Sequence, residues 1–244
     1  MQSAMTQALL MQTQTIETPA GPISFVLLGR TSAGRARTLL TKQPATIEWI
    51  DRFHPGSVLW DIGANVGVYS LYAALRGNAR VVAFEPAAVN YFLLAANCES
   101  NRLESRVDCL LLGVGEGHSM ARLEVSQFAS AKSFSFRARP HRPLPGRQAA
   151  LIVSMDQLVG EFGLPCPNYI KIDTPGMSEA IINGGLQTLQ RPEVRELHIE
   201  LRERSKGGQR IAKMLERCGF VITGRYHHGG SADVTFARPG AESL

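Results

Sequence analysis

Short runs of apolar residues alternate along this chain with stretches in which apolar residues recur every three or four positions. The apolar runs predict buried strands over 58–60, 80–85, 107–113, 168–173 and 196–201. The periodic stretches predict amphipathic helices over 66–76, 87–99, 178–189 and 209–218. Strands and helices that alternate in this way are typical of an α/β fold with a mostly parallel, doubly wound sheet.

The C-terminal and middle segments depart from this alternation. Residues 220–226 and 232–237 predict a hairpin whose first strand runs parallel to the sheet and whose second returns antiparallel. A small β insertion is predicted from strands at 121–125 and 133–137, and a further strand is predicted at 149–154. Residues 137–147 form a proline-rich basic loop, which is either an exposed solubilising loop or a lid over an anionic or sugar substrate.

The N-terminal segment is expected to be an addition to this fold. We expect the first 20 residues to be frayed, a short strand to begin at Ile23, and two helical pieces to cover 36–53 with a break at Pro44. At 244 residues the chain is long enough for one α/β domain with a full core. We therefore divide it into an extension, 1–35, and a main domain, 36–240.

The segment 57–70, SVLWDIGANVGVYS, carries the main candidate ligand site. An apolar strand ends at Asp61, and a turn with Gly63 and Gly67 leads into a helix, so backbone N–H groups can approach a ligand closely. The glycine spacing differs from the GxGxxG of dinucleotide sites, and Asp61 would repel a phosphate. A carboxylate here suits the ammonium group of an amino-acid-bearing cofactor, which favours S-adenosylmethionine over NAD.

Glu85 ends the second predicted strand, followed by Pro86. In a Rossmann-like sheet, an acidic side chain at this place accepts hydrogen bonds from the two ribose hydroxyls of a nucleoside. A solvated loop acid is the alternative for this residue taken alone. Together with Asp61 and its glycines, Glu85 favours the ribose role.

Composition narrows the possible partners more than it narrows the possible chemistry. The net charge is +5, with both signs interspersed, which permits an anionic substrate but gives no basic stripe typical of nucleic-acid binding. The four cysteines form no CxxC pair, and the N-terminus lacks the basic region of a signal peptide. No run approaches the about 18 apolar residues of a membrane span. These features predict a cytoplasmic protein whose partner is a small molecule or glycan; they leave its oligomeric state undetermined.

Several motifs in order resemble the FkbM family of S-adenosylmethionine-dependent methyltransferases. They are WDIGANVGVYS, VVAFEP followed by NYFLLAAN, NYIKID followed by an ING helix, and the upstream TLLTKQPATIEWIDRF. The resemblance covers roughly residues 36–222. It implies a class I methyltransferase fold, a Rossmann-like sheet of seven strands, and O-methylation of hydroxyls on sugars or natural products.

The resemblance also implies roles for individual residues. Residues of the first turn would hold the methionine moiety of the cofactor, the end of the second strand its ribose, and a later turn its adenine. The tip of the fourth strand would face the methyl group. These positions are Asp61, Gly63, Asn65 and Gly67; Glu85 with Pro86; Gly115 and Glu116; and Lys171 and Asp173, respectively.

Asp173 is the candidate catalytic base, or a ligand of a divalent metal that acidifies the acceptor hydroxyl. A turn-capping acid is the structural alternative. Lys171 points to the same face of the strand, where it could lower the pKa of Asp173, bind an anionic substrate group or form a plain salt bridge. Glu200 could join Asp173 in holding a metal or the acceptor, and His227 and His228 are alternative bases.

One position departs from the family pattern and keeps other functions open. After KID the family has an acid where this chain has Pro175. Proline removes an N–H donor and stiffens the turn, so a cofactor-binding homologue with little catalysis is the main alternative to an enzyme. Nucleic-acid methylation is less favoured, because the sequence lacks the second proline and the aromatic residue that stack on a flipped base. An NAD-linked oxidoreductase would need the missing GxGxxG.

Overall fold

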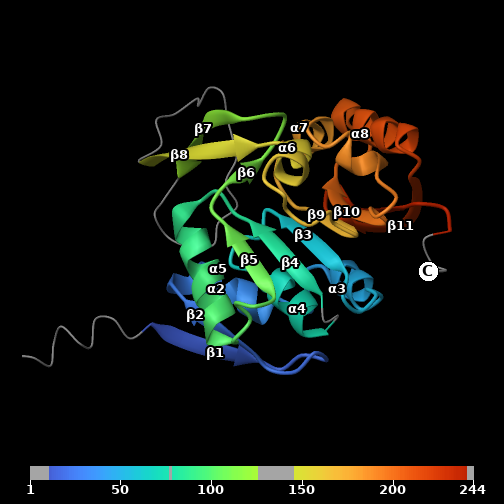
Figure 1. The fold of residues 1–244 in the computed structure, drawn as a ribbon. Helices are drawn as coiled ribbons and strands as arrows, with labels where there is room; N and C mark the ends of the chain where they lie inside the picture. Colours follow the sequence, from blue (N-terminus) through green and yellow to red (C-terminus); the bar gives the residue numbers. More distant parts are fainter. Residues whose placement is uncertain (1–10, 77–78, 126–145, 241–244) are drawn as a thin grey trace, which may run out of the picture.

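The computed structural model describes residues 11–76, 79–125 and 146–240. Its centre is a seven-stranded sheet in the order β11-β12-β10-β9-β3-β4-β5, in which β12 alone runs opposite to the other six strands (Figure 1). The predicted α/β class, the mostly parallel sheet and the antiparallel return of the last strand are confirmed. The strands are β3 (Val58–Ile62), β4 (Arg80–Phe84), β5 (Val107–Leu110), β9 (Tyr169–Ile172), β10 (Glu196–Leu201), β11 (Val221–His228) and β12 (Ser231–Ala237).

Helices cover both faces of this sheet (Figure 1). One face carries α2 to α5, and the other carries the later helices and a small second sheet. The helices are α2 (Gly29–Arg37), α3 (Pro44–Ile50), α4 (Val68–Arg76), α5 (Ala88–Ser100), α6 (Met155–Gly160), α7 (Ser178–Asn183), the 3₁₀ turn η1 (Thr188–Gln190) and α8 (Lys206–Arg217). None of the helices in these described stretches is long and apolar enough to cross a bilayer.

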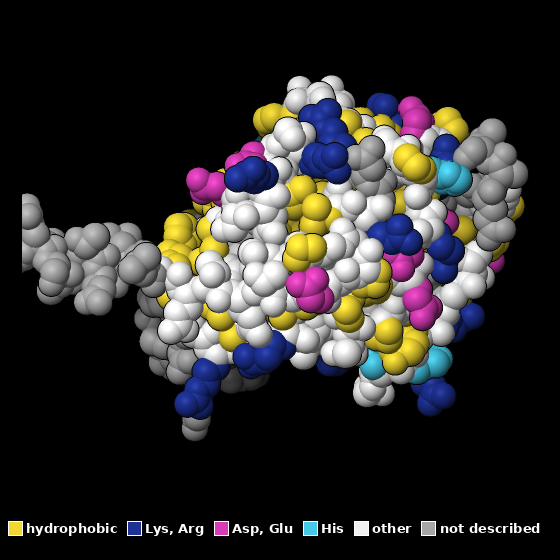
Figure 2. Space-filling model, turned by 90° about the horizontal axis from the view of Figure 1, so that it is seen from below, with side chains coloured by type: hydrophobic (Ala, Val, Ile, Leu, Met, Phe, Trp, Pro, Cys, Tyr) yellow, Lys and Arg dark blue, Asp and Glu magenta, His cyan; other side chains and the backbone are white. Residues whose placement is uncertain are grey.

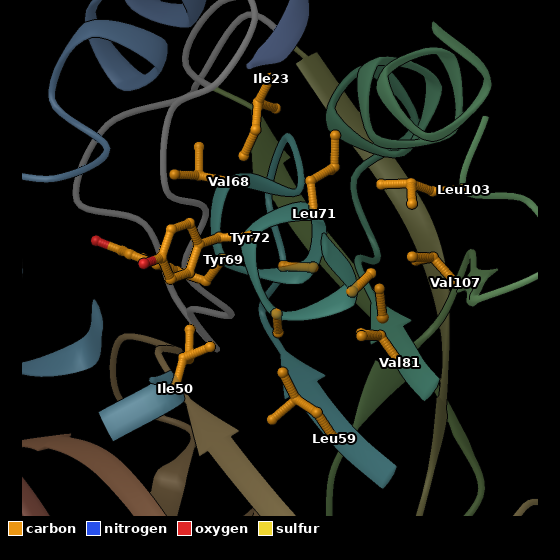
Figure 3. Close-up of a cluster of buried hydrophobic side chains, with 14 of the residues drawn as sticks. Ile23, Ile50, Leu59, Val68, Tyr69, Leu71, Tyr72, Val81, Leu103 and Val107 are labelled. Atoms are coloured by element: carbon orange, nitrogen blue, oxygen red, sulfur yellow. The ribbon is translucent and has the colours of Figure 1, made fainter. Parts of the chain in front are cut away.

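The core explains why α4 forms where the sequence predicts a helix. Its apolar side chains, among them Leu71 and Tyr72, lie over Leu59 of β3 and Val81 of β4 (Figure 3). Leu59 and Val81 are fully buried, as expected for central parallel strands covered on both faces. This packing fixes the start of α4 next to the end of β3, where the candidate ligand turn lies.

The small β insertion forms a separate three-stranded sheet. Strands β7 (Ser119–Val125) and β8 (Gly146–Val153) pair antiparallel, and β6 (Gly113–Val114) pairs parallel to β8. The predicted strand over 107–113 is therefore divided, because its end leaves the main sheet and joins this one. The predicted strand at 133–137 and the basic loop up to residue 145 lie outside the described residues.

The described part of the N-terminal segment, from residue 11, is more ordered than the sequence suggested. A strand, β1 (Gln12–Ile16), pairs antiparallel with β2 (Ile23–Leu27), where fraying was expected. The prediction failed because QTQTI has only one apolar residue, and its order comes from pairing rather than burial. Backbone N–H groups of β2 donate to Asn97 of α5 and to Asn101, which caps the C-terminal end of α5, at 2.6 and 2.8 Å respectively.

Two helix predictions also need correction. The first helical piece was expected from residue 36, but α2 begins at Gly29, so the expected domain boundary after residue 35 falls inside a helix. The helix expected over 178–189 ends at Asn183. Gly184 and Gly185 follow it, and a Cβ at either position would lie 1.9 Å from a neighbouring atom, so this turn packs too tightly for larger residues.

Candidate functional site

The predicted ligand turn connects β3 to α4 at the carboxyl edge of the sheet. Gly63 adopts a φ of +88° and donates its N–H to the Phe84 carbonyl oxygen at 3.0 Å. A Cβ at Gly63 would lie 2.5 Å from the Asp173 carbonyl oxygen. A glycine is therefore required at position 63, because the loop after β9 approaches it closely. This approach brings the ends of β3 and β9 together.

The other residues of the turn have different surroundings. Asn65 has a φ of +56° and lines a narrow pocket at this edge. Gly67 has a φ of +84°, and a Cβ there would lie 2.5 Å from Leu94 Cδ1 and 2.7 Å from Leu71 Cδ1. Gly67 thus serves the packing of α4 against α5, whereas Gly63 and Asn65 lie at the pocket itself.

Glu85 lies at the end of β4, and its carboxylate links two loops at the same pocket. Oε2 accepts from the Asn65 N–H at 2.9 Å, and Oε1 accepts from the Ala87 N–H at 2.8 Å. Glu85 and Pro86 both line the pocket, and their predicted contact with a ribose stays a prediction. Burial raises the pKa of Glu85 to about 7, although the two N–H donors oppose that shift.

Glu85 should make folding stability depend on pH. From pH about 4.5 to about 7 the folded protein holds a proton on Glu85 that the unfolded chain has released, so the free energy of unfolding falls as pH rises, by up to about 3 kcal/mol. Glu85→Gln should remove this slope. Urea denaturation at about pH 5 and about pH 8 measures it. Glu99→Gln, at an exposed position of α5, is the control. Equal slopes in wild type and Glu85→Gln would contradict this assignment.

Lys171 joins two acidic residues beneath the pocket. Its Nζ lies 3.6 Å from Asp61 Oδ1 and 3.7 Å from Asp173 Oδ2, and 4.9 Å from the centre of the Tyr69 ring. Lys171 and Asp173 share a face of β9 as predicted. Burial alone would raise the pKa of Asp173, but the charges of Lys171, Lys42 and Arg35 and a hydrogen bond with Glu200 together outweigh it, so the carboxyl is held below its usual range.

Asp61 lies behind the residues that line the pocket. Its side chain is fully buried, and Oδ2 accepts from the Ser70 hydroxyl at 2.6 Å. Asp61 does not line the pocket. Its predicted contact with the ammonium group of the cofactor stays a prediction; in this conformation the carboxylate pairs with Lys171.

Further acids and a histidine surround Asp173 at this edge. Glu200 shares a hydrogen bond with Asp173, and burial together with the charge of Asp173 raises the pKa of Glu200. His228 Nε2 lies 3.2 Å from Asp233 Oδ1, whereas His227 is exposed. In the described residues, no group of three or more His, Cys, Asp or Glu side chains is arranged to hold a metal ion.

Two pockets meet at the loop that follows β9. The first is the narrow pocket that contains Asn65 and Glu85; the second is a cavity of about 560 Å³ between this loop and α8. We call them the inner and the outer pocket. Both are lined by Asp173, Thr174 and Pro175. A ligand in the inner pocket and one in the outer pocket would thus face each other across Asp173.

Some predicted residues lie elsewhere, and one contributor was missed. Gly115 is buried beside β8 and Glu116 is exposed, and neither lines the two pockets, so their predicted contact with adenine stays a prediction. Arg35 of α2 lines the inner pocket, although it belongs to the segment expected to be an extension. The only feature of the sequence that could have indicated Arg35 is that it is a basic residue near the end of a helix.

The family model described as "Methyltransferase FkbM domain" matches residues 61–222. The chain belongs to the FkbM methyltransferase family. The matched domain is a methyltransferase domain, and the methyl donor of the family is S-adenosylmethionine. The acidic strand end at Glu85 and the Gly63 turn fit such a donor, since they offer an acceptor for ribose hydroxyls and close backbone approach.

Two curated relatives of this FkbM-family chain are methyltransferases by name. The hexuronic acid methyltransferase AglP of Haloferax volcanii is 26% identical over 156 residues, covering 64% of this chain and 61% of its own. The 31-O-demethyl-FK506 methyltransferase FkbM of Streptomyces tacrolimicus is 24% identical, with 69% and 74% covered. The chain thus spans about three fifths of the length of the first relative.

Solved structures share the fold of this FkbM-family chain. A crystal structure of the methyltransferase FkbM from Methylobacillus flagellatus has a TM-score of 0.56 at 17% identity, covering 75% of this chain and 44% of that chain. The precorrin-6y C5,15-methyltransferase from Geobacter metallireducens has a TM-score of 0.50 at 17% identity, with 83% and 91% covered. These likenesses support the class I methyltransferase fold that the motifs implied.

Proposed function

We propose that this protein is an S-adenosylmethionine-dependent O-methyltransferase that acts on a hydroxyl group of a saccharide or secondary metabolite. The observation that carries the proposal is the shared wall at Asp173, Thr174 and Pro175. It allows a donor in the inner pocket and an acceptor in the outer pocket to meet at one carboxylate. The names of the two curated relatives, which refer to a hexuronic acid and to the 31-O position of FK506, support the acceptor class.

Each residue group has a defined part in this proposal. When bound, S-adenosylmethionine supplies a methyl group activated by its sulfonium. Glu85 and the turn at Gly63 and Asn65 hold the donor. Asp173 would accept the proton that the acceptor hydroxyl loses when the hydroxyl oxygen takes up the methyl group. Lys171, placed between Asp61 and Asp173, keeps Asp173 ionised for that task.

The outer pocket offers polar groups suited to a hydroxylated acceptor. Glu200, Ser231, Ser205 and Arg202 line it, and the Ser231 hydroxyl donates to Glu200 Oε1 at 2.9 Å. Mixed donors and acceptors around a cavity are the pattern that binds several hydroxyl groups of one molecule. On the face shown in Figure 2, basic and acidic side chains are interspersed rather than gathered into one basic patch, so nothing there favours a nucleic-acid acceptor.

Methyl transfer can be tested with the full chain, S-adenosylmethionine and two acceptor sets, uronic-acid glycosides and macrolide alcohols. We expect S-adenosylhomocysteine to form together with a methylated acceptor, both detected by mass spectrometry. Because uronic acids also carry a carboxyl group, the product is treated with mild alkali, which cleaves a methyl ester but leaves a methyl ether intact. Alkali-labile products, or methylation confined to amines, would contradict O-methylation of a hydroxyl.

Pro175 supports a second candidate, a donor-binding protein with little catalysis. It stands where the family has an acid, and it lines both pockets. Comparison of the wild type with Pro175→Glu separates the two functions. If both proteins bind S-adenosylhomocysteine and neither methylates either acceptor set, the non-catalytic function is favoured; turnover by the wild type excludes it.

A further inference from the structure

Arg35 brings a positive charge to a pocket whose other charged walls are acidic. The inner pocket is lined by Glu85 on one side and Asp173 on the other, and Arg35 is the one cationic side chain among the described residues that line it. Arg35 interacts electrostatically with both carboxylates. It is half-buried, near the C-terminal end of α2.

The nearby lysines are placed differently. Lys171 has only 3% of its side chain exposed and is held between Asp61 and Asp173. Lys42 lies near Asp173 and Glu200 but does not line the inner pocket. Among these cations, Arg35 is therefore the one that a ligand in the inner pocket meets.

The chemistry of the donor requires such a cation. S-adenosylmethionine carries a sulfonium, an ammonium and a carboxylate. Negative charge on the pocket walls, at Glu85 and Asp173, repels that carboxylate unless a cation lies beside it. A guanidinium binds a carboxylate through two parallel hydrogen bonds, which a lysine ammonium cannot match in geometry.

We propose that Arg35 binds the carboxylate of the methionine moiety of the donor. This inference rests on the proposed donor site between Glu85 and Asp173 and adds a binding residue from the N-terminal segment. α2 is suited to hold Arg35 in place, because its Ser32 and Ala36 are buried. The Ser32 hydroxyl also accepts from the Leu28 N–H at 2.8 Å and donates to the Gly29 carbonyl oxygen at 3.0 Å.

Isothermal titration of the full chain with two ligands tests the inference. S-adenosylhomocysteine retains the amino-acid moiety of the donor, whereas 5′-methylthioadenosine lacks it. Arg35→Ala should weaken S-adenosylhomocysteine binding about 10- to 100-fold and change methylthioadenosine binding less than about threefold. Arg35→Lys should recover part of the loss. Arg37→Ala is the matched control, since Arg37 lies in the same last turn but is exposed and outside the pocket.

The outcomes distinguish a failure of the proposed role of Arg35 from a failure of the proposed donor site. Unchanged S-adenosylhomocysteine affinity in Arg35→Ala would overturn it, and so would an equal loss for both ligands, which would mean that Arg35 only shapes the pocket. If the wild type binds neither ligand, the proposed donor site fails and the inference fails with it. Circular dichroism of each variant shows whether a loss of affinity comes from misfolding.

Discussion

Replacement of Lys171 by methionine is expected to lower the free energy of unfolding by about 3–5 kcal/mol. The lysine side chain is only 3% exposed and lies between the carboxylates of Asp61 and Asp173. Burial alone would lower the pKa of Lys171, but Asp61 and Asp173, together with Asp233 and Glu200, raise it above its ordinary value. Methionine would leave the fully buried Asp61 without a cation, and an unpaired buried charge is strongly destabilising.

Urea denaturation at neutral pH measures this loss. Lys213→Met, at an exposed position of α8, controls for the loss of a lysine charge and should change stability by less than about 0.5 kcal/mol. The double variant Asp61→Asn, Lys171→Met should be more stable than Lys171→Met alone, because no buried charge is left without its partner. A loss below about 1 kcal/mol in Lys171→Met would show that the pair is not coupled in the fold.

The same residues show what the sequence could and could not predict. The apolar strands ending at Asp61, Glu85 and Asp173 placed three acids at one edge of a parallel sheet, which follows from strand direction alone. The depth of each acid depends on neighbours distant in sequence. Ser70 and Lys171 enclose Asp61, whereas Glu85 is also buried but stays at the pocket wall.

For the N-terminal segment, the sequence predicted neither strand β1 nor the position of α2 at the pocket. Its strand β1 has almost no apolar pattern, and α2 is short and mostly polar, so neither its order nor its place at the pocket can be read from periodicity. Both depend on tertiary contacts, such as the bonds between β2 and the asparagines of α5. For this reason Arg35 escaped a prediction that placed the ends of the central strands correctly.

Asp173, in the loop after β9, is the proposed acceptor of the hydroxyl proton, and its substitution tests that role. Asp173→Asn should lower methyl transfer by about 10² to 10⁴ while the affinity for S-adenosylhomocysteine changes less than about threefold. Asparagine keeps the shape of the side chain but cannot accept the hydroxyl proton. The loss should therefore appear in kcat rather than in KM. The measurement is the initial rate of S-adenosylhomocysteine formation with an acceptor that the wild type methylates, alongside isothermal titration.

Asp108→Asn on β5, at a half-exposed carboxylate paired with Arg80 of β4, is the matched control and should retain wild-type turnover. If Asp173→Asn keeps its rate within about threefold, the base lies elsewhere. His228 is then the next candidate, because it pairs with Asp233 at the same edge, and His228→Asn would carry the loss instead. The two variants tested together thus assign the proton acceptor to the loop after β9 or to the C-terminal hairpin.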